Sequence, residues 1–402
     1  MNILLVTDSY PPEIRSAAHL MQELAEELFR EKHVVTVVTC YPRHNLAGGS
    51  TQAKFDEVLV ENGVNVVRVD ALPVHNIAFI LRGIAQLLMP GRFIKSIRKL
   101  KSKKIDIVIV YSPPLTLAKV GKFVKEKYGA KFILNIQDIF PQNAIDLGII
   151  KNRLLISMFE GIEFRAYRSA DKIAVHSRGN KLFLINKKFQ PEEKVEVLHN
   201  WIDPLPYISA RRTGSFREKY GLQGKFIFLF AGVIGPSQGL EFLIQTAALL
   251  KENQDIRFLI VGDGMQKNKL MKSVVEQKLN NVIFQPFVVQ SEYPLLVKDA
   301  DAGLVCLSSM NKTPVVPGKV LGFMAAGLPV LALLNKESDG HILIKDAQCG
   351  YAAVSNDPQE AARIILSMHT EKNLIQLGAN GFNYLLKNFT KEICIKQLEG
   401  MF

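Results

Sequence analysis

Short apolar runs recur along the whole chain and constrain its fold more than any other feature. They are continuous, rich in Val and Ile, and separated by segments with helical periodicity such as 17–30 and 116–128. Continuous apolar strands that alternate with helices are typical of a parallel sheet buried on both faces. In the first half of the chain the predicted strands are residues 3–7, 34–40, 64–69, 105–111, 132–136, 173–176 and 195–198.

The second half repeats this plan. Its predicted strands are residues 226–232, 257–262, 282–287, 303–307, 330–333 and 351–354. A chain of 402 residues also exceeds the size at which one hydrophobic core usually stops growing, about 250 to 300 residues. We therefore predict an α/β protein with two doubly wound, Rossmann-like domains that face a central cleft, where the carboxyl ends of both sheets would bind ligands.

The boundary between the two domains is predicted from residues 199–206. This stretch holds two prolines, which disfavour regular structure, and the only tryptophan of the chain. The predicted domains are 1–203 and 204–388. Residues 389–402 are predicted to form a further amphipathic helix that is capped at Thr390.

Composition limits the class of protein. Hydrophobic residues make up 48% and charged residues 22% of the chain, as in globular proteins. The sequence contains no uninterrupted run of 18 apolar residues, so no membrane-spanning helix is predicted. The N-terminus starts with a predicted strand, and no signal peptide is predicted there. We therefore expect a cytoplasmic location. The cysteines Cys40, Cys306, Cys349 and Cys394 are far apart and show no metal-ligand spacing, so we expect reduced thiols and no metal site. We also expect no bound cofactor.

A basic segment lies in the first half. Residues 82–104 contain eight cations and no acidic residue, interleaved with apolar side chains. Such an amphipathic segment can bind a membrane surface, with about 1 kcal/mol per cation near anionic lipid. A solvated helix packed on its own sheet is an equally open alternative, and nucleic-acid binding is disfavoured because no aromatic residues alternate with the cations. The cations are Arg82, Arg92, Lys95, Arg98, Lys99, Lys101, Lys103 and Lys104.

Residues 316–333 combine a loop, a short helix, a helix stop and an apolar strand. Pro317 and Gly318 break the chain before the helix, and Gly327 ends it. Unpaired N–H groups at a helix start carry a partial positive charge, and Lys319 adds a full charge at the same end. These residues predict a phosphate site, although a tightly packed helix-to-strand turn would show the same pattern.

A glycine-rich loop precedes this motif. Residues 230–239 read Phe-Ala-Gly-Val-Ile-Gly-Pro-Ser-Gln-Gly, so three glycines lie between a predicted strand and a predicted helix. Glycines at such a place allow the backbone to approach a ligand closely. Their spacing differs from the Rossmann dinucleotide pattern, and Lys267 stands where a third glycine would follow the pair in 262–264. A nicotinamide enzyme is therefore disfavoured.

Together these motifs resemble those of the family 4 retaining glycosyltransferases, which have the GT-B fold. Residues 317–330 resemble the family motif P-[ST]-K-x-x-E-[YF]-[ML]-A-x-G-x-P-V, which contacts the nucleotide-sugar donor. Residues 232–239 resemble the diphosphate loop G-x-x-x-x-x-[KQ]-G, 261–264 resemble V-G-[DE]-G, and 195–203 match V-x-V-x-x-N-x-x-D. The resemblance implies donor contacts from Gly232, Gly235, Gln238, Gly239, Gly262, Asp263, Gly264, Phe287, Pro317, Gly318 and Lys319.

Two motifs of the first domain resemble the same family. Residues 8–17 resemble the opening [DN]-x-[YF]-x-P-E of a subgroup that includes fucosaminyl and related surface-polysaccharide transferases. This implies acceptor contacts from Arg15, Ser16 and Ala17. Residues 137–141 resemble [HRQ]-D-[LI]-[WF]-P, which makes Asp138 a candidate for the reacting centre; a cap of the following turn is the alternative role.

The chain departs from the family pattern at four positions. Val233 and Gln238 stand where the common pattern places Arg and Lys, and Pro314 and Gly322 stand where it places two glutamates. The lost cations leave Lys319 and the amides of the glycine loop as the main expected phosphate partners. Losing the second glutamate removes an expected contact to ribose.

The resemblance implies a retaining glycosyltransferase that uses a hexose or an N-acetylaminosugar. The donor would be a nucleoside diphosphate sugar, UDP- more than GDP-linked, and the acceptor a lipid-linked glycan of bacterial O-antigen, capsule or exopolysaccharide. Asp138 and Lys319 would be the catalytic residues. The last helix would pack back on the first domain, and the enzyme would act peripherally at the inner face of the cell membrane. A non-catalytic GT-B sugar-binding subunit and a UDP-sugar 2-epimerase remain alternatives.

Overall fold

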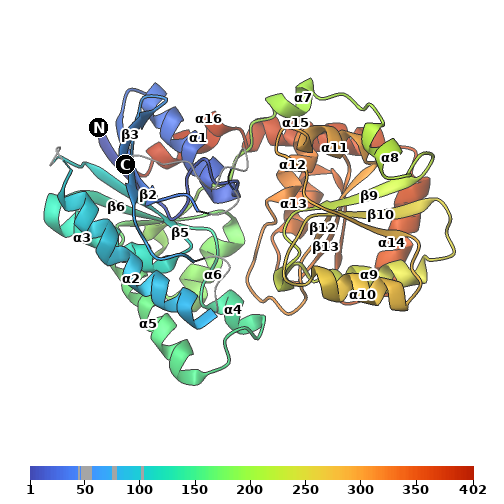
Figure 1. The fold of residues 1–402 in the computed structure, drawn as a ribbon, viewed down its shortest axis with the longest axis horizontal. Helices are drawn as coiled ribbons and strands as arrows, with labels where there is room; N and C mark the ends of the chain where they lie inside the picture. Colours follow the sequence, from blue (N-terminus) through green and yellow to red (C-terminus); the bar gives the residue numbers. More distant parts are fainter. Residues whose placement is uncertain (44–45, 47–56, 75–78, 101–103) are drawn as a thin grey trace. The chain divides into compact units, whose positions relative to one another are not determined.

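The computed structural model describes residues 1–43, 46, 57–74, 79–100 and 104–402, and it contains two compact units (Figure 1). The first unit comprises Met1–Ile145, Ile150–Asn200 and Lys391–Phe402, and the second comprises Asp146–Ile149 and Trp201–Thr390. Each unit holds one mainly parallel sheet with helices packed against it. The predicted α/β class with two doubly wound domains is confirmed.

Within the described residues, the sheet of the first unit has eight strands in the order β3-β4-β2-β1-β5-β6-β7-β8. All neighbouring pairs are parallel except β3 with β4. The strands are β1 Asn2–Val6, β2 Val34–Cys40, β3 Val58–Glu61, β4 Val64–Val69, β5 Ile107–Ser112, β6 Lys131–Ile136, β7 Lys172–Val175 and β8 Val195–Val197. The helices are α1 Ser16–Arg30, α2 Phe79–Arg98, α3 Ala118–Tyr128, α4 Gln142–Asp146, α5 Arg153–Ser169, α6 Arg178–Lys188 and α16 Lys391–Glu399, with 3-10 turns η1 Leu115–Leu117 and η2 Glu192–Lys194.

The second unit has, again within the described residues, a six-stranded parallel sheet in the order β11-β10-β9-β12-β13-β14. Its strands are β9 Phe226–Ala231, β10 Ile256–Val261, β11 Val282–Gln285, β12 Ala302–Cys306, β13 Val330–Leu334 and β14 Gly350–Val354. The helices are α7 Leu205–Ser209, α8 Ser215–Lys219, α9 Leu240–Leu249, α10 Lys267–Glu276, α11 Tyr293–Asp299, α12 Lys319–Ala325, α13 Gly340–Ala347, α14 Pro358–Thr370 and α15 Leu374–Asn388, with the 3-10 turn η3 Pro236–Gln238.

Burial on both faces of the sheet explains why the strands are continuously apolar. On β9, Leu229 packs into the hydrophobic cluster on one side of the sheet, whereas Phe228 and Phe230 pack into the cluster on the other. Successive side chains of a strand point to opposite faces. A strand covered on both sides therefore needs apolar residues at every position, which is the pattern that the sequence shows.

Two segments around the crossings between the units differ in detail from the prediction. The prolines of 199–206 were expected to disfavour regular structure, but α7 begins at Leu205, within that stretch. Pro204 precedes this helix and Pro206 lies in its first turn, where a missing N–H breaks no helical hydrogen bond. The predicted helix of 389–402 extends over Lys391–Glu399 and packs on α1, where Lys391 Nζ lies 3.5 Å from Glu27 Oε2.

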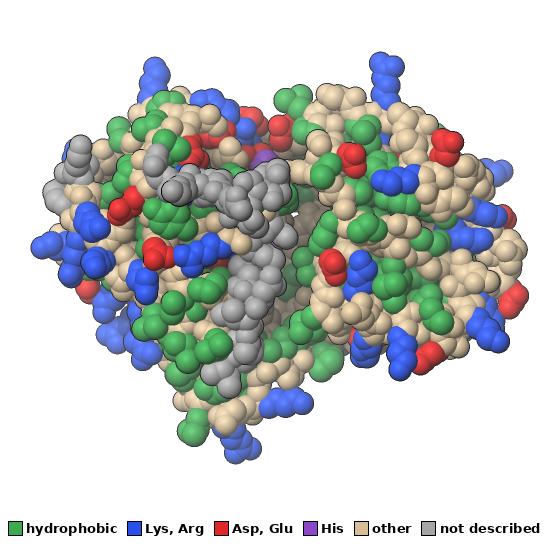
Figure 2. All heavy atoms as spheres, viewed as in Figure 1, with side chains coloured by type: hydrophobic (Ala, Val, Ile, Leu, Met, Phe, Trp, Pro, Cys, Tyr) green, Lys and Arg blue, Asp and Glu red, His purple; other side chains and the backbone are tan. Residues whose placement is uncertain are grey.

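Helix α2 carries residues 82–98 of the predicted basic segment. Lys99 and Lys104 follow the helix, and Lys101 and Lys103 lie outside the described residues. One stripe of α2 is fully buried, from Ala85 through Met89 and Phe93 to Ile97, so the helix packs on its own sheet. Its other face exposes apolar residues and the cations Arg82, Arg92, Lys95 and Arg98. Figure 2 shows Lys and Arg side chains beside hydrophobic ones on the face of the first unit turned to the viewer. Over the described residues, no helix has the length and hydropathy of a membrane span.

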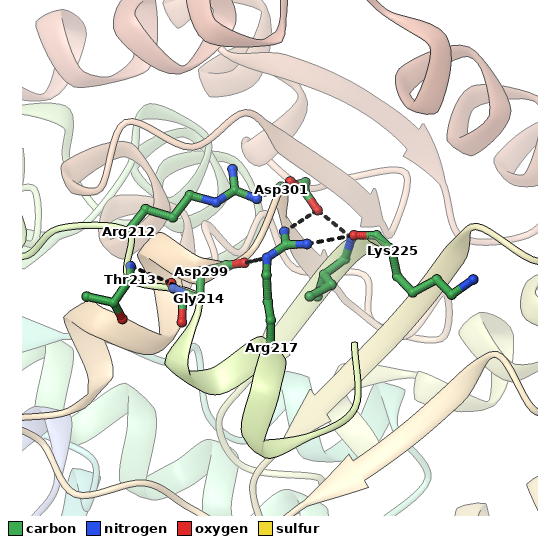
Figure 3. A network of polar contacts seen from close by, with 8 residues as sticks. Arg212, Thr213, Gly214, Arg217, Lys225, Asp299 and Asp301 are labelled. Atoms are coloured by element: carbon green, nitrogen blue, oxygen red, sulfur yellow. Dashed lines mark hydrogen bonds and ion pairs between the residues drawn. The ribbon is translucent and has the colours of Figure 1, made fainter. Parts of the chain in front are cut away.

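A polar network anchors the segment 212–217 to the amino-terminal side of the second sheet (Figure 3). Asp299 accepts the backbone N–H groups of Thr213, Gly214 and Phe216 at 3.0, 2.8 and 2.9 Å. Arg217 donates to Asp301 Oδ2 at 2.6 Å and to the Asp299 carbonyl at 2.7 Å. Since parallel α/β sheets bind ligands at their carboxyl ends, this network serves the stability of the fold.

Candidate functional site

Lys319 lies beyond the carboxyl end of the second sheet, as the first residue of α12. Its Nζ donates to Oε1 of Gln238 at 2.8 Å and lies 5.1 Å from the centre of the Phe230 ring. A Cβ atom on Gly232 would come within 2.6 Å of Lys319 Cε. The glycine therefore leaves the space through which Lys319 reaches Gln238. The structure brings the two predicted phosphate motifs together.

Lys319 is a partly buried cation that has no carboxylate counter-charge among the described residues. Burial lowers the pKa of its half-buried ammonium group to about 8, and the nearby Cys306 opposes this shift. In the described part of the chain no carboxylate forms an ion pair with Lys319, and its hydrogen bond is to a neutral amide oxygen. A cation that is taken out of water without a counter-charge is destabilised. A bound anion would remove this penalty and form a charge-assisted hydrogen bond.

The glycines of the two loops above β9 and β10 serve a direct contact between the loops. A Cβ atom on Gly262 would lie 1.9 Å from the carbonyl oxygen of Gly232, and one on Gly264 would lie 2.3 Å from that of Ile234. The N–H of Ile234 also donates to the Asp263 carbonyl at 2.7 Å. Any donor contact from this region would therefore come from backbone that the packed loops hold in place.

The remaining part of the glycine loop is fixed from the other side. Gly239 has φ +59°, and a Cβ atom there would lie 2.7 Å from Ser308 Cα. The N–H of Ser308 donates to the Ser237 carbonyl at 2.9 Å. Gly235 leads into the turn η3, which ends at Gln238. Val233, at the position of a family cation, is exposed, so Lys319 is the cation that reaches Gln238 and the loop.

The start of α12 offers fewer unpaired amides than its sequence predicts. The N–H of Val320 donates to the carbonyl of Pro317 at 3.1 Å, and the N–H of Leu321 donates to that of Gly318 at 3.2 Å. A helix of this length, Lys319–Ala325, also has a small dipole because few peptide units add to it. The case for an anion site therefore depends on the Lys319 side chain more than on the helix.

Three other predicted positions lie around this place. Asp263 accepts the N–H of Gly264 at 2.7 Å with an otherwise exposed side chain. Phe287 follows β11 and is 51% exposed, so its ring is available to a ligand. Gly322 lies inside α12, one turn beyond Lys319, and Pro314 is buried in the preceding loop. Neither of these two offers an ionisable group.

In the first unit, Arg15 is already engaged by acidic residues. Its Nη1 lies 3.2 Å from Asp8 Oδ2 and 3.9 Å from Glu13 Oε2. Ser16 begins α1 with an exposed side chain, whereas Ala17 is buried in the helix packing. Two carboxylates beside one guanidinium favour hydroxyl or amine groups of a ligand over a further phosphate.

Asp138 follows β6 at the carboxyl end of the first sheet and is exposed. Protein atoms around it desolvate the carboxylate and raise its pKa, an effect that its exposure limits. Its charge also reaches Tyr111 at the end of β5. Burial is the main cause that raises the pKa of Tyr111, and Asp138 and Asp8 add to it while Arg15 opposes them. The predicted Asp138 and Arg15 therefore lie near one another, and Tyr111 and Asp8 join them.

Asn200 is one position of the motif in residues 195–203, and the structure gives its side chain a partner. Its Nδ2 donates to Oε1 of Gln137 at 2.6 Å, and Gln137 Nε2 donates to Asn135 Oδ1 at 2.9 Å. The side chain next to Asp138 is thus held from both sides. Two residues 63 positions apart give no local sequence signal for this contact.

Two family models match the chain. A model described as glycosyl transferases group 1 matches residues 213–382, and a model described as a glycosyl transferase 4-like domain matches residues 17–201. The probable glycosyltransferase WbjE of Pseudomonas aeruginosa is 26% identical over 326 residues, which is 79% of this chain and 78% of that protein. The putative colanic acid biosynthesis glycosyl transferase WcaI of Escherichia coli K12 is 26% identical over 343 residues, 81% and 82% of the two chains.

Solved structures show the same fold. HepE of Anabaena in complex with UDP-glucose has a TM-score of 0.72 at 17% sequence identity, over 100% of this chain and 99% of that chain. With the two parallel-sheet domains described above, this likeness confirms the predicted GT-B fold. Since one glycosyltransferase model matches most of each unit, the chain belongs to the group 1, glycosyltransferase 4-like family of glycosyltransferases.

Proposed function

We propose that this glycosyltransferase moves a hexose or an N-acetylaminosugar from a UDP-sugar to a lipid-linked glycan of a bacterial surface polysaccharide, with retention of the anomeric configuration. The observation that carries the proposal is Lys319, a half-buried cation that meets the glycine loop and has a neutral partner. WcaI is a putative colanic acid biosynthesis glycosyl transferase, which supports the acceptor class, and the complex of HepE with UDP-glucose supports the donor class.

The second unit holds the donor in this proposal. Lys319 binds the diphosphate, and the backbone of 232–239 donates N–H groups to it. During transfer the bond between the sugar and the diphosphate breaks, and negative charge develops on the leaving group. Lys319 stabilises that charge, as preorganised donors do at the centre of a reaction. The acceptor oxygen forms the new bond and gives its proton to the leaving phosphate.

The first unit presents the acceptor in this proposal. Arg15 and Ser16 contact the acceptor glycan, and Asp138 serves the reacting centre. The paired charges of Arg15, Asp8 and Glu13 suit the hydroxyl groups of a sugar. The lipid-linked phosphates of the acceptor would then bind elsewhere on the protein.

We place those phosphates and the membrane surface against the helices of the first unit. Leu81, Ile84 and Leu88 of α2 are exposed among cations. The start of α5 adds a second apolar surface, because Leu154 is 82% exposed beside Arg153. Cations beside exposed apolar side chains favour an anionic lipid surface over bulk water.

The test of function is a transfer assay. The full chain is incubated with radiolabelled UDP- and GDP-sugars and a bacterial lipid extract, and label in the lipid phase is measured. We expect transfer from a UDP-sugar, with the retained configuration visible by NMR of the product. A 2-epimerase would instead change the donor sugar without labelling lipid, and a sugar-binding subunit would bind the donor without turnover.

The matched control for Lys319 is Lys298. It lies in the same unit, burial also lowers its pKa, and its Nζ donates to the Ala326 carbonyl at the far end of α12 at 2.7 Å. Lys319→Met should lower kcat/KM. The loss should correspond to about 2 to 4 kcal/mol of transition-state stabilisation, the range of one lost charge-stabilising donor. Lys298→Met should leave donor kinetics unchanged. Equal effects of both substitutions would contradict the diphosphate site.

A further inference from the structure

Two tyrosine hydroxyls face the same glycine of α12. A Cβ atom on Gly322 would lie 3.4 Å from Tyr207 Oη and 3.6 Å from Tyr293 Oη. Tyr207 comes from α7 and Tyr293 is the first residue of α11. Their rings meet edge to face, with 6.3 Å between the centroids. Both hydroxyls therefore border the small space that a side chain at position 322 would fill.

The two hydroxyls have no hydrogen-bond partner among the described protein groups. Tyr207 is nevertheless only 8% exposed. Neither hydroxyl is among the fully enclosed polar atoms that lack a partner, so each keeps some contact with solvent. A largely buried polar group without a partner is unfavourable. Bound ligand is one way in which a protein supplies the missing partner.

Both hydroxyls keep their proton at neutral pH. Burial raises the pKa of Tyr293 to about 12, and burial together with the charge of Tyr293 raises that of Tyr207 further. A protonated tyrosine hydroxyl can donate one hydrogen bond and accept others. The pair is therefore suited to a ligand that itself carries hydroxyl groups.

The position of the pair relates it to the proposed donor site. Gly322 is three residues after Lys319 on α12, so the two lie on one face of the helix, about 5 to 6 Å apart between Cβ positions. On the other side, Tyr293 follows the loop that carries the exposed ring of Phe287, and Val288 of that loop packs in the same apolar cluster. The tyrosines thus pack in one cluster with the helix that carries the diphosphate candidate and with the loop that carries an aromatic residue able to stack on a base.

We propose that Tyr207 and Tyr293 bind the ribose hydroxyls of the nucleotide donor, and that Gly322 keeps them accessible. The inference rests on the proposed function, because ribose is the group that joins a base to a diphosphate. Glycine inside a helix is less favourable than alanine. An alanine Cβ atom would fit here at van der Waals distance, but it would cover the two hydroxyls.

The experiment compares UDP with 2′-deoxy-UDP and 3′-deoxy-UDP in calorimetric titrations of the full chain. The wild-type protein should bind UDP about 3- to 10-fold more tightly than at least one deoxy analogue, the range of one net hydrogen bond. Combining Tyr207→Phe with Tyr293→Phe keeps both rings and should abolish this preference. The affinity for the deoxy analogue should stay unchanged, and Tyr220→Phe is the matched control in the same unit.

Gly322→Ala gives a second, independent readout. The variant should keep its fold, because the added Cβ atom would lie no closer than 3.4 Å to its nearest neighbours, Tyr207 and Tyr293. It should also reduce UDP affinity to at least the level of the deoxy analogue. A folded Gly322→Ala protein with unchanged UDP affinity would overturn the role of Gly322.

The outcomes separate this inference from the proposed function. Lys319→Met should weaken UDP and its deoxy analogues by the same factor, so that the preference for UDP survives. Equal wild-type affinity for UDP and both analogues, or an unchanged preference in the double tyrosine variant, overturns the ribose contact while the diphosphate site stands. If UDP does not bind, the same comparison is made with GDP; binding of neither overturns the proposed donor and the ribose contact together.

Discussion

Replacing Lys319 by methionine should make the unliganded protein more stable and the enzyme much less active. Methionine keeps most of the length and apolar bulk of the side chain but removes the charge. The pKa of Lys319 falls from 10.5 to about 8 in the folded protein. At about 1.4 kcal/mol per unit, the charged form is destabilised by at most about 3.5 kcal/mol. Residual exposure and the hydrogen bond to Gln238 reduce this figure.

The pH dependence gives the sign of the effect. Between pH 8 and 10.5 the unfolded chain holds the Lys319 proton and the folded chain has lost it, so folding stability rises with pH in this window. Below about pH 8 both states are charged, and the full penalty applies to the wild type. The stability advantage of Lys319→Met should therefore be largest near neutral pH and shrink from pH 8 to 10.5.

Urea denaturation of the wild type and of Lys319→Met at several pH values measures the difference in their free energies of unfolding. The other titrating groups are the same in both proteins, so their contributions cancel in this difference. Wild-type kcat/KM should also fall above about pH 8, where the free enzyme loses the Lys319 proton. Lys298→Met is the control for nonspecific effects of removing a lysine. A Lys319→Met protein that is less stable than wild type at pH 7, or that keeps wild-type turnover, would refute the reasoning.

Three further predictions concern other parts of the chain. Asp138→Asn keeps the shape and capping ability of the residue, so a role at the reacting centre predicts a loss of at least about a hundredfold in kcat, roughly 2.7 kcal/mol, at unchanged melting temperature. Reversing Lys95, Arg98 and Lys99 to Glu should weaken the free energy of binding to anionic vesicles, measured by sedimentation, by about 3 kcal/mol or more. Asp299→Ala leaves three N–H groups without their carboxylate and should lower the free energy of unfolding by about 2 to 4 kcal/mol.

Each of these predictions has a control. Normal turnover in a stable Asp138→Asn protein would end the catalytic assignment. Zwitterionic vesicles should not distinguish the basic-segment variant from wild type, and unchanged binding to anionic vesicles would assign α2 to packing alone. Asp357→Ala removes a partly exposed cap that accepts two N–H groups and should cost only about 1 kcal/mol. An equally small loss at Asp299 would contradict the anchoring role.

The sequence predicted the sheets well because parallel strands are buried on both faces. Strands β2 and β4 have the predicted bounds, and most others differ by one or two residues. The antiparallel strand β3 was missed because it is short and largely exposed. A signal was present: Asn62-Gly63 joins β3 to β4, and both residues have positive φ, at 49° and 85°. Such a pair between two strands is typical of a tight hairpin turn.

The site was less predictable because its contacts are long-range. The sequence identified Lys319 and Gln238 separately, whereas their hydrogen bond spans 81 positions. It assigned Gly262 and Gly264 to ligand approach, and the structure uses them for contact between two loops. The two tyrosines beside Gly322 lie outside every sequence motif that resembles the family. Local pattern predicts which residues end a strand or start a helix, but it does not predict which side chains meet there.

The place of α16 in the chain has a consequence for synthesis. Its residues Cys394, Ile395 and Leu398 are buried in the first unit, yet they follow the second unit in the sequence. At roughly 5 to 20 residues per second, a ribosome needs about 10 to 40 s to make the stretch from Trp201 to Thr390. During that time the nascent first domain lacks a helix, and part of α1 stays uncovered. A recombinant fragment that stops at Asn200 would share this defect permanently, whereas joining residues 391–402 to its end by a linker should restore the missing cover.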